Sequence, residues 1–185
     1  CYTVCETGLP YGGMTYPGLA MLSAGEIAAG GEKREQLVAR ETAQQWWSAV
    51  IGTDGTRQPW QDEALSEFSL LDYWESRHGK AARDALQFSR LDTAMRVTIP
   101  RGVTPGSPVD YFGDTSEYRV VVWGRGGAAL CALNDAMGGQ LDAFLRRYGA
   151  EYAFALATRA DFETLLKAVT GEDWSPLLRD YLDTY

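Results

Sequence analysis

The sequence has few of the residues that most often bind transition metals. Of its 185 residues, one is histidine (His78) and three are cysteine (Cys1, Cys5 and Cys131). A single histidine excludes any site that needs two imidazoles, and the cysteines lack the spacing of metal ligands. Their odd number does not indicate a disulfide framework, so the redox compartment stays open, as does a lone Cys1–Cys5 bridge.

Positive charge and long apolar runs are also scarce. The chain has 17 lysines and arginines against 25 acidic residues and a net charge of -8, so we expect no basic surface for nucleic acid or anionic lipid. Apolar runs such as residues 120–123 are far shorter than the roughly 20 residues that cross a bilayer. No signal-peptide pattern opens the chain. This segment is therefore expected to contact neither nucleic acid nor a membrane.

Hydrophobic residues make up 45% of the chain, which suffices for the core of one domain, residues 1–185. Their periodicity, with the positions of proline and glycine, predicts a mainly α fold with a small N-terminal extended or β portion. Gly126 and Gly127 lie inside one expected helix and predict that another element packs closely there. The expected extended segments are residues 2–8 and 12–22, and the expected helices are residues 33–51, 59–79, 80–95, 116–137, 140–149, 159–171 and 175–184, with a proline- and glycine-rich loop at 98–115.

The first long helix carries two polar side chains within an apolar stripe. Its stripe, with intervals of three and four residues, consists of Leu37, Arg40, Gln44, Trp47 and Ile51. A buried arginine is costly unless it is paired, so Arg40 needs an acidic partner, for which Glu41 and Glu63 are the candidates. The alternative is that Arg40 and Gln44 flank the core and reach solvent.

The same helix resembles the zinc-binding helix of the aminopeptidase N family of zinc metallopeptidases. The family motif is HExxH, then 18 residues, then glutamate. Residues 40–44, RETAQ, stand in place of HExxH, and 18 residues separate Gln44 from Glu63. The neighbouring QQWW, residues 44–47, is similar to the family's HQWF or HQWW, and DEALSEF, residues 62–68, is similar to its NEGFAEY.

Further segments follow in the family order. GGMTYPGL, residues 12–19, resembles the GxMEN-type substrate strand, and VWGRGGAAL, residues 122–130, resembles the VYxKGA segment with the catalytic tyrosine. Residues 138–182 are similar to the helices that close the catalytic domain. The resemblance implies a thermolysin-like metallopeptidase catalytic-domain fold, present here as a fragment of a larger protein whose other domains are expected partners.

The resemblance also shows which parts of the zinc site are changed. Arg40 and Gln44 replace the two histidine ligands, and a guanidinium has no lone pair to donate, while an amide oxygen is a weak ligand. Glu63 is the only surviving ligand-type residue. Glu41 matches the general base, which has little to do without an activated water. We therefore expect no metal and no cofactor, and we predict that Arg40 forms an ion pair with Glu63.

Two more positions implied by the resemblance are altered. Thr15 stands where a glutamate recognises the substrate's free amine, so Gly12, Gly13, Met14 and Thr15 form a vestigial substrate strand. Trp123 replaces the tyrosine that stabilises the oxyanion and is a poorer hydrogen-bond donor of different shape. Four parts of one mechanism are thus missing together.

Two functions follow from these observations. The first is a catalytically inactive pseudo-aminopeptidase domain, retained as a structural module or as a module that binds a peptide or protein segment in the vestigial cleft. The alternative is an active aminopeptidase-type metallopeptidase with an atypical site that uses Glu41 and Glu63, with zinc as its cofactor. The aromatic residues expected to line the cleft are Trp46, Trp47, Trp60, Trp123 and tyrosines, and the alternative is that these aromatic residues belong to the core.

Overall fold

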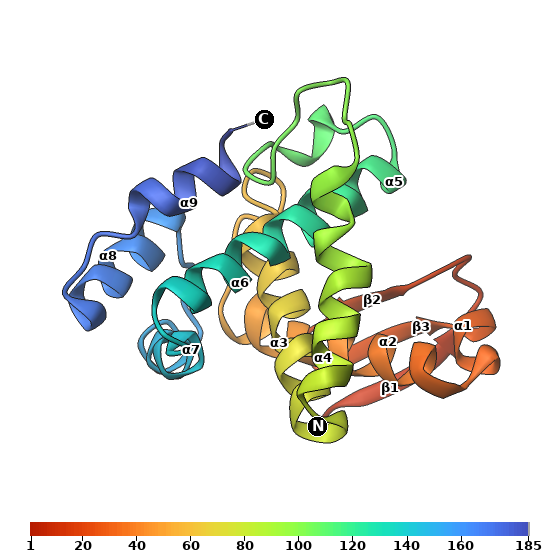
Figure 1. Ribbon diagram of the computed structural model, residues 1–185. Helices are drawn as coiled ribbons and strands as arrows, with labels where there is room; N and C mark the ends of the chain where they lie inside the picture. Colours follow the sequence, from red (N-terminus) through yellow and green to blue (C-terminus); the bar gives the residue numbers. More distant parts are fainter. Residues whose placement is uncertain (185) are drawn as a thin grey trace.

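A computed structural model describes residues 1–184, which form a small N-terminal sheet followed by helices. The strands are β1 (Thr3–Thr7), β2 (Gly13–Tyr16) and β3 (Leu19–Ser23), and their order in the sheet is β1-β3-β2. β1 is parallel to β3, and β2 is antiparallel to it. The mainly α fold with a small N-terminal β portion confirms the sequence prediction (Figure 1).

The extended segment expected at residues 12–22 is two strands rather than one. Pro17 and Gly18 form a tight connection between β2 and β3, so that Tyr16 pairs with Leu19. Gly18 has a φ of +76°, which a residue with a side chain rarely adopts. The prediction of one strand was wrong because the Pro-Gly pair folds the chain back on itself.

The expected long helices are present, and three of them contain a π-helical stretch. The first consists of α2 (Gly31–Gln44) and η1 (Gln45–Val50), and the third consists of α4 (Lys80–Gln87) and η2 (Phe88–Asp92). The helix expected at 116–137 consists of α5 (Thr115–Tyr118), η5 (Arg119–Arg125) and α6 (Gly126–Ala136). A short helix at residues 24–29, which Ser23 caps by accepting a hydrogen bond from the Glu26 N–H, was not predicted. The bounds are α1 Ala24–Ala29, α2 Gly31–Gln44, η1 Gln45–Val50, α3 Trp60–His78, α4 Lys80–Gln87, η2 Phe88–Asp92, η3 Ala94–Arg96, η4 Val109–Tyr111, α5 Thr115–Tyr118, η5 Arg119–Arg125, α6 Gly126–Ala136, α7 Leu141–Glu151, α8 Arg159–Thr170 and α9 Ser175–Leu182.

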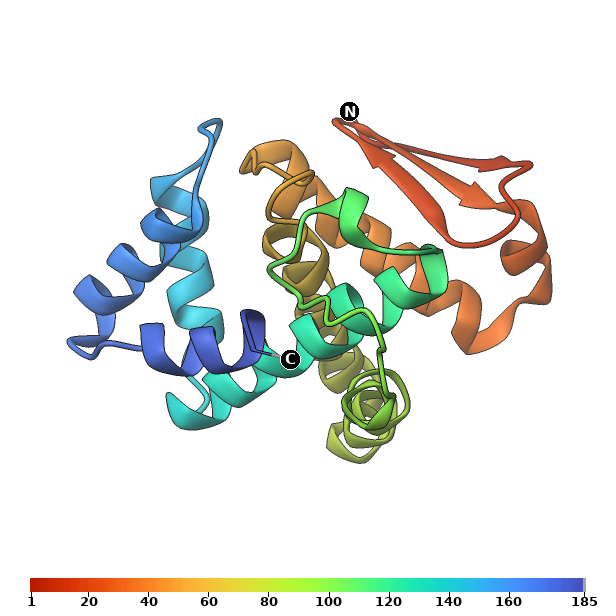
Figure 2. The same ribbon diagram turned by 90° about the horizontal axis from the view of Figure 1, so that it is seen from above.

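Helix α3 lies at the centre of the helical part and contacts α2, α4 and α6. The sheet lies on one side of these helices and α7 to α9 on the other, as both ribbon views show (Figures 1 and 2). Trp60, at the start of α3, is fully buried, and its ring meets Phe162 of α8 edge-on at 5.7 Å. Trp60 therefore belongs to the core and does not line a cleft, contrary to the expectation from its sequence.

The two glycines at the start of α6 permit close packing. A Cβ at Gly126 would lie 3.0 Å from the Ala64 side chain of α3, and one at Gly127 would lie 2.9 Å from the Leu91 side chain. These contacts confirm that another element approaches closely there. They place the start of α6 against α3 and η2.

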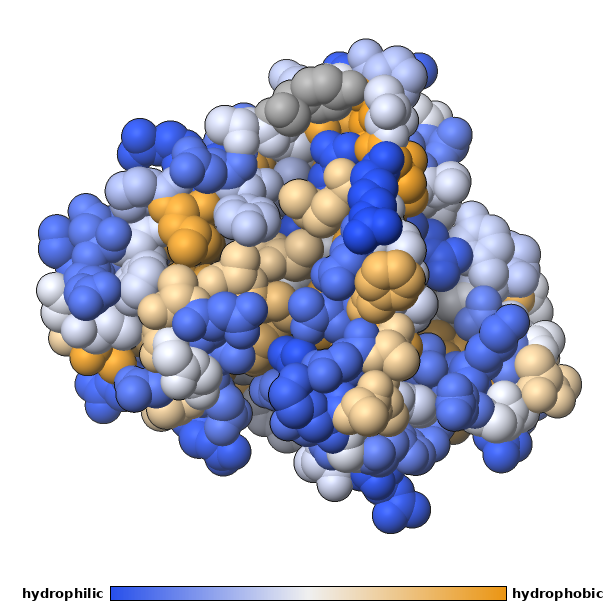
Figure 3. All heavy atoms as spheres, viewed as in Figure 1, coloured by the Kyte–Doolittle hydropathy of each residue, from blue (hydrophilic) through white to orange (hydrophobic). Residues whose placement is uncertain are grey.

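The surface is mixed in character. Hydrophilic residues dominate the face shown in Figure 3, and hydrophobic residues gather where α8 and α9 meet the centre of the molecule.

Within residues 1–184, none of the helices combines the length and the apolar character that a membrane crossing requires. Cys1, Cys5 and Cys131 are all free thiols, so the bridge left open between Cys1 and Cys5 is not formed.

Candidate functional site

The guanidinium of Arg40 contacts three carboxylates in the interior. Its Nη2 donates to Oε2 of Glu63, its Nη1 lies 3.0 Å from Oε1 of Glu41, and its Nε lies 2.6 Å from Oε1 of Glu67. Only 4% of Arg40 is exposed. The predicted ion pair between Arg40 and Glu63 is thus confirmed, and the alternative in which Arg40 reaches solvent is wrong.

Glu67 is a site residue that sequence reasoning missed. It lies one helical turn after Glu63 on α3, so the two carboxylates share a face, and that i to i+4 spacing was the available signal. Arg90 of η2 also binds it, with Nε 2.9 Å from Oε2 and Nη2 2.7 Å from Oε1. Burial alone would raise the pKa of Glu67, but the charges of Arg90 and Arg40 outweigh it and lower the pKa to about 2.

The carboxylate of Glu63 is held by two further side chains. Gln44 donates its Nε2 to Oε2 at 2.9 Å, and the hydroxyl of Tyr118 donates to Oε1 at 3.3 Å. Burial by itself would lower the pKa of Arg40, yet the negative charges of Glu63, Glu67 and Glu41 raise it above its ordinary value. Arg40 therefore stays charged at every accessible pH.

Strand β2 lies directly against Glu41. The hydroxyl of Thr15 donates to Oε2 of Glu41 at 2.7 Å, and a Cβ at Gly13 would lie 2.6 Å from the Cγ of Glu41. Met14 points to the opposite face and is exposed, while Gly12 precedes the strand and has no side-chain neighbour. Of the four residues of the vestigial substrate strand, the structure brings Gly13 and Thr15 to the site and leaves Met14 and Gly12 outside.

Trp123 contacts Arg40 through its ring. The Cζ of Arg40 lies 3.8 Å from the indole centroid, and the Cζ of Arg119 lies 4.7 Å from it. The indole N–H of Trp123 is buried and has no hydrogen-bond partner within residues 1–184. Trp123 is thus a packing surface for two cations and donates no hydrogen bond to the site.

The carboxyl group of Asp62, which lies beside the site, has a pKa close to neutral pH. Asp62 immediately precedes Glu63 on α3, and burial together with the charge of Glu63 raises the pKa of Asp62 to about 7. Its Oδ1 accepts a hydrogen bond from the Glu63 N–H. The local charge is therefore more balanced at neutral pH than a count of acidic residues suggests.

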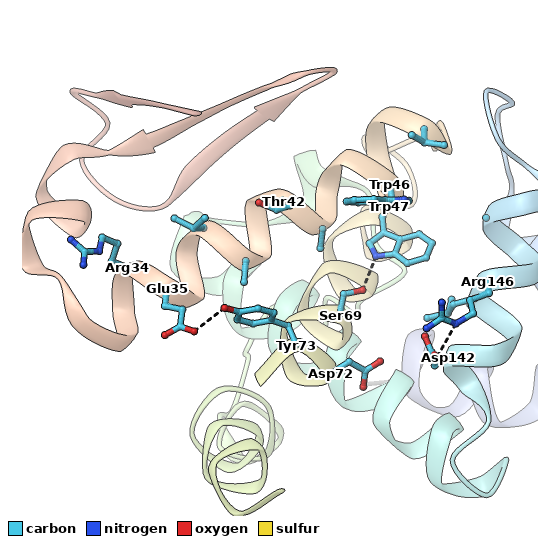
Figure 4. A pocket seen from close by; sticks show the side chains of 16 residues that line it. Arg34, Glu35, Thr42, Trp46, Trp47, Ser69, Asp72, Tyr73, Asp142 and Arg146 are labelled. Carbon is cyan, nitrogen blue, oxygen red and sulfur yellow. Dashed lines mark hydrogen bonds and ion pairs between the residues drawn. The ribbon is translucent and has the colours of Figure 1, made fainter. Parts of the chain in front are cut away.

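The tryptophans expected to share a cleft lie in three different places. Trp46 and Trp47 line a groove of about 880 Å³ between α2 with η1, α3 and α7 (Figure 4). Trp46 is 53% exposed, and the Trp47 indole N–H donates to Ser69 at 2.8 Å. Trp60 is in the core and Trp123 lies beside Arg40. The expectation of one cleft lined by all four was wrong because Arg40 of α2 and Trp46 of η1 lie on different faces of one continuous helix.

Comparisons with known proteins identify the fold. No protein-family model and no curated protein sequence matches the chain. Native LTA4 hydrolase from yeast is 20% identical with a TM-score of 0.78, over 99% of this chain and 31% of that one. An E323A mutant of the M1 zinc metallopeptidase from Deinococcus radiodurans, bound to a Tyr-Ser-Ala substrate, is 21% identical with a TM-score of 0.72, over 98% of this chain and 39% of that one. The chain thus has the fold of a part of these proteins and spans between 31% and 39% of their lengths.

The residues at this site do not fit a zinc ion. Zinc takes imidazole nitrogen, thiolate sulfur or carboxylate oxygen as ligands. At the three motif positions only Glu63 offers such an atom, and its oxygens already accept hydrogen bonds from Arg40, Gln44 and Tyr118. No cluster of three or more His, Cys, Asp or Glu side chains within residues 1–184 is arranged to hold a metal ion.

Proposed function

We propose that this chain is a catalytically inactive, metallopeptidase-like domain that serves as a structural or peptide-binding module. The observation that carries the proposal is the buried guanidinium of Arg40 among the carboxylates of Glu41, Glu63 and Glu67. The likeness in fold to an M1 zinc metallopeptidase supports the correspondence between Arg40 and the first ligand position of the motif. On this proposal a fixed side-chain cation replaces a divalent metal.

The exchange has a direct chemical consequence. A metal of this kind acts by lowering the pKa of a bound water and by polarising the carbonyl of the substrate. A guanidinium that is saturated by carboxylates can neutralise their charge but cannot bind and activate a water in this way. The fold is then retained, while the metal-activated water that hydrolyses a peptide bond is lost.

The alternative function, an active peptidase that uses Glu41 and Glu63, receives less support. A general base needs a carboxylate oxygen that is free to accept a proton from water. Oε1 of Glu41 accepts from Arg40, and its Oε2 accepts from Thr15. Both oxygens of Glu63 are likewise engaged. The two carboxylates serve to hold Arg40 in this arrangement.

The finer features of the proposal follow from the likeness in fold. We assign to the chain a thermolysin-like arrangement and a place as one part, residues 1–185, of a longer protein, because the similar structures are much longer. The Deinococcus protein is bound to a Tyr-Ser-Ala substrate. A peptide or protein segment is therefore the proposed partner of this chain, together with other domains of such a longer protein.

The test combines metal analysis with an activity assay. The purified chain is dialysed against zinc, its metal content is measured by inductively coupled plasma mass spectrometry, and turnover of amino-acid arylamides is followed with and without zinc. We expect substoichiometric zinc and no turnover. One zinc per chain together with hydrolysis that a chelator abolishes would overturn the proposal and favour the alternative.

A further inference from the structure

A second, smaller cavity adjoins the site on the η2 and η3 side of Trp123. Its volume is about 270 Å³, and it lies between the segment from Ser89 to Val97 and the π-helical η5. Two arginines, Arg90 and Arg119, line it together with Glu67 and the Trp123 indole. A cavity with two cations is unusual in a chain whose net charge is -8.

Arg119 has no carboxylate partner. Within residues 1–184 no acidic group lies within ion-pair distance of its half-buried guanidinium, whose contacts are the ring faces of Trp123 at 4.7 Å and Tyr11 at 5.7 Å. A guanidinium carries five N–H donors, and ring faces satisfy its charge only in part. The donors of Arg119 are thus available to an acceptor from outside the chain.

Arg90 also keeps donor capacity. Its Nε and Nη2 are used by Glu67, while no protein acceptor binds its Nη1 in the described part of the chain. Glu67 cannot supply further neutralisation, because Oε1 already accepts from both Arg40 and Arg90, and Oε2 accepts from Arg90. The charged groups that line the cavity are thus Arg90, Arg119 and the single carboxylate of Glu67, which also pairs with Arg40.

The rest of the lining is apolar or already hydrogen-bonded. Val97, Val120 and Ala94 supply aliphatic surface, and the hydroxyls of Ser89 and Thr93 donate to backbone carbonyls of their own helix. A ligand that fits this lining therefore joins an anionic head to a short apolar body. A planar carboxylate matches the donor fork of a guanidinium.

We propose that this cavity binds an organic carboxylate, whose head pairs with Arg119 and Nη1 of Arg90 and whose stem lies against the aliphatic wall. The carboxylate comes either from a small free acid or from the C-terminal residue of a peptide. This inference rests on the proposed function, because it names the ligand that the proposed binding module takes.

The test is isothermal titration calorimetry of the full chain in the presence of a chelator. The probes are hexanoate and its neutral match hexanamide, and an Ala-Ala-Leu peptide with a free or an amidated C-terminus. We expect saturable binding of at least one carboxylate probe, at least about tenfold tighter than its amide match, because hydrogen bonds to a charged group are lost in the amide. Affinity should fall as salt is added.

Substitutions locate the binding. R119Q is expected to weaken binding of the carboxylate at least about tenfold, whereas R57Q, which removes an exposed arginine from another surface, leaves it unchanged. Binding of hexanoate alone identifies a small acid as the source, and binding of the free-ended peptide alone identifies a C-terminus. Equal binding of amide and acid, no binding of either probe, or equal affinities in R119Q and the unaltered chain overturn the inference.

A second measurement does not depend on how R119Q folds. The Nε–Hε signals of arginine side chains are recorded by NMR in the unaltered chain, and those of Arg119 and Arg90 are expected to shift when hexanoate is added. Where hexanoate does not bind in the calorimetric test, the free-ended peptide is added in its place, and unchanged signals at saturation with the carboxylate probe that binds contradict the site. Zinc-dependent hydrolysis would overturn the proposed function and leave this result standing, while failure of carboxylate binding leaves the inactive domain standing.

Discussion

The guanidinium of Arg40 lies over the indole of Trp123, with its central carbon 3.8 Å from the ring centroid. Under the proposed function, these two residues stand where the family that the sequence resembles has a metal ligand and the tyrosine that stabilises the oxyanion. Here they contact each other as a cation and a ring. The two replacements thus form one packing unit, in which the ring covers a charge that Glu41, Glu63 and Glu67 neutralise at its edge.

Removal of the Arg40 charge should be strongly destabilising. R40M removes the cation that Glu41, Glu63 and Glu67 share and leaves only Glu67 with a second one, Arg90. Loss of one partner from a buried ionic group costs about 3–5 kcal/mol. Urea unfolding monitored by circular dichroism measures this loss. R57M, at an exposed arginine, should change stability by no more than about 0.5 kcal/mol. A loss below about 1 kcal/mol in R40M would show that the cluster is not held by Arg40.

The contact between Arg40 and Trp123 should appear as a coupling energy. In a double-mutant cycle of R40M, W123L and the double variant, we expect a favourable coupling of about 0.5–2 kcal/mol, the range for partly to fully desolvated cation–π pairs. The readout is again the free energy of unfolding in urea. Additive effects of the two substitutions would mean that Trp123 only fills space.

Stability should decrease in strong acid because of Glu67. Its pKa is about 2 in the folded protein against an ordinary 4.5, so its contribution is fully present above pH 4.5. It is lost as the pH falls from 4.5 toward 2, by up to roughly 3 kcal/mol. The difference in unfolding free energy between the unaltered chain and E67Q, measured between pH 6 and pH 3, isolates this contribution from that of other carboxyl groups such as Asp62. A difference that stays constant across this window would contradict the pairing of Glu67 with Arg90 and Arg40.

Asp62 should act in the opposite direction near neutrality. Burial and Glu63 raise its pKa to about 7 from 3.8, so the folded state binds a proton more tightly than the unfolded state. Its destabilising effect is complete above pH 7 and is relieved as the pH falls from 7 toward 3.8. We expect D62N to raise stability at pH 8 by at least about 1 kcal/mol and to have little effect at pH 4. If D62N changed the free energy of unfolding equally at pH 8 and pH 4, the change would come from packing and not from the charge of Asp62.

Residue spacing predicted the centre of the site, and packing determined the rest. The resemblance to the HExxH motif, with 18 residues between Gln44 and Glu63, implied that Glu63 meets the helix of Arg40, so that ion pair could be predicted. Glu67 could not be chosen over other acids of α3, because the reach of Arg40 depends on how α2 packs against α3. Arg90 comes from a third segment, η2, and no local pattern links it to Glu67.

The secondary structure could likewise be predicted from the sequence only in part. Helices that carry long apolar stripes and end in glycine, such as the one over residues 59–79, followed from periodicity and terminal residues. The short helix at residues 24–29 carries too few apolar positions to show a period. Trp46 and Trp60 are the same residue type, yet one is exposed and the other buried, because burial depends on which neighbour covers each face.

The most direct measurement is a zinc titration of the double variant R40H/Q44H against the unaltered chain. If Arg40 occupies the position of a lost metal, the double variant should bind one zinc per chain, with Glu63 as the third ligand. Its free energy of unfolding should then rise by about 2.7 kcal/mol at a zinc concentration of 100 times Kd, while the unaltered chain shows no rise. Stoichiometric zinc in the unaltered chain, or no zinc in the double variant, would contradict the account.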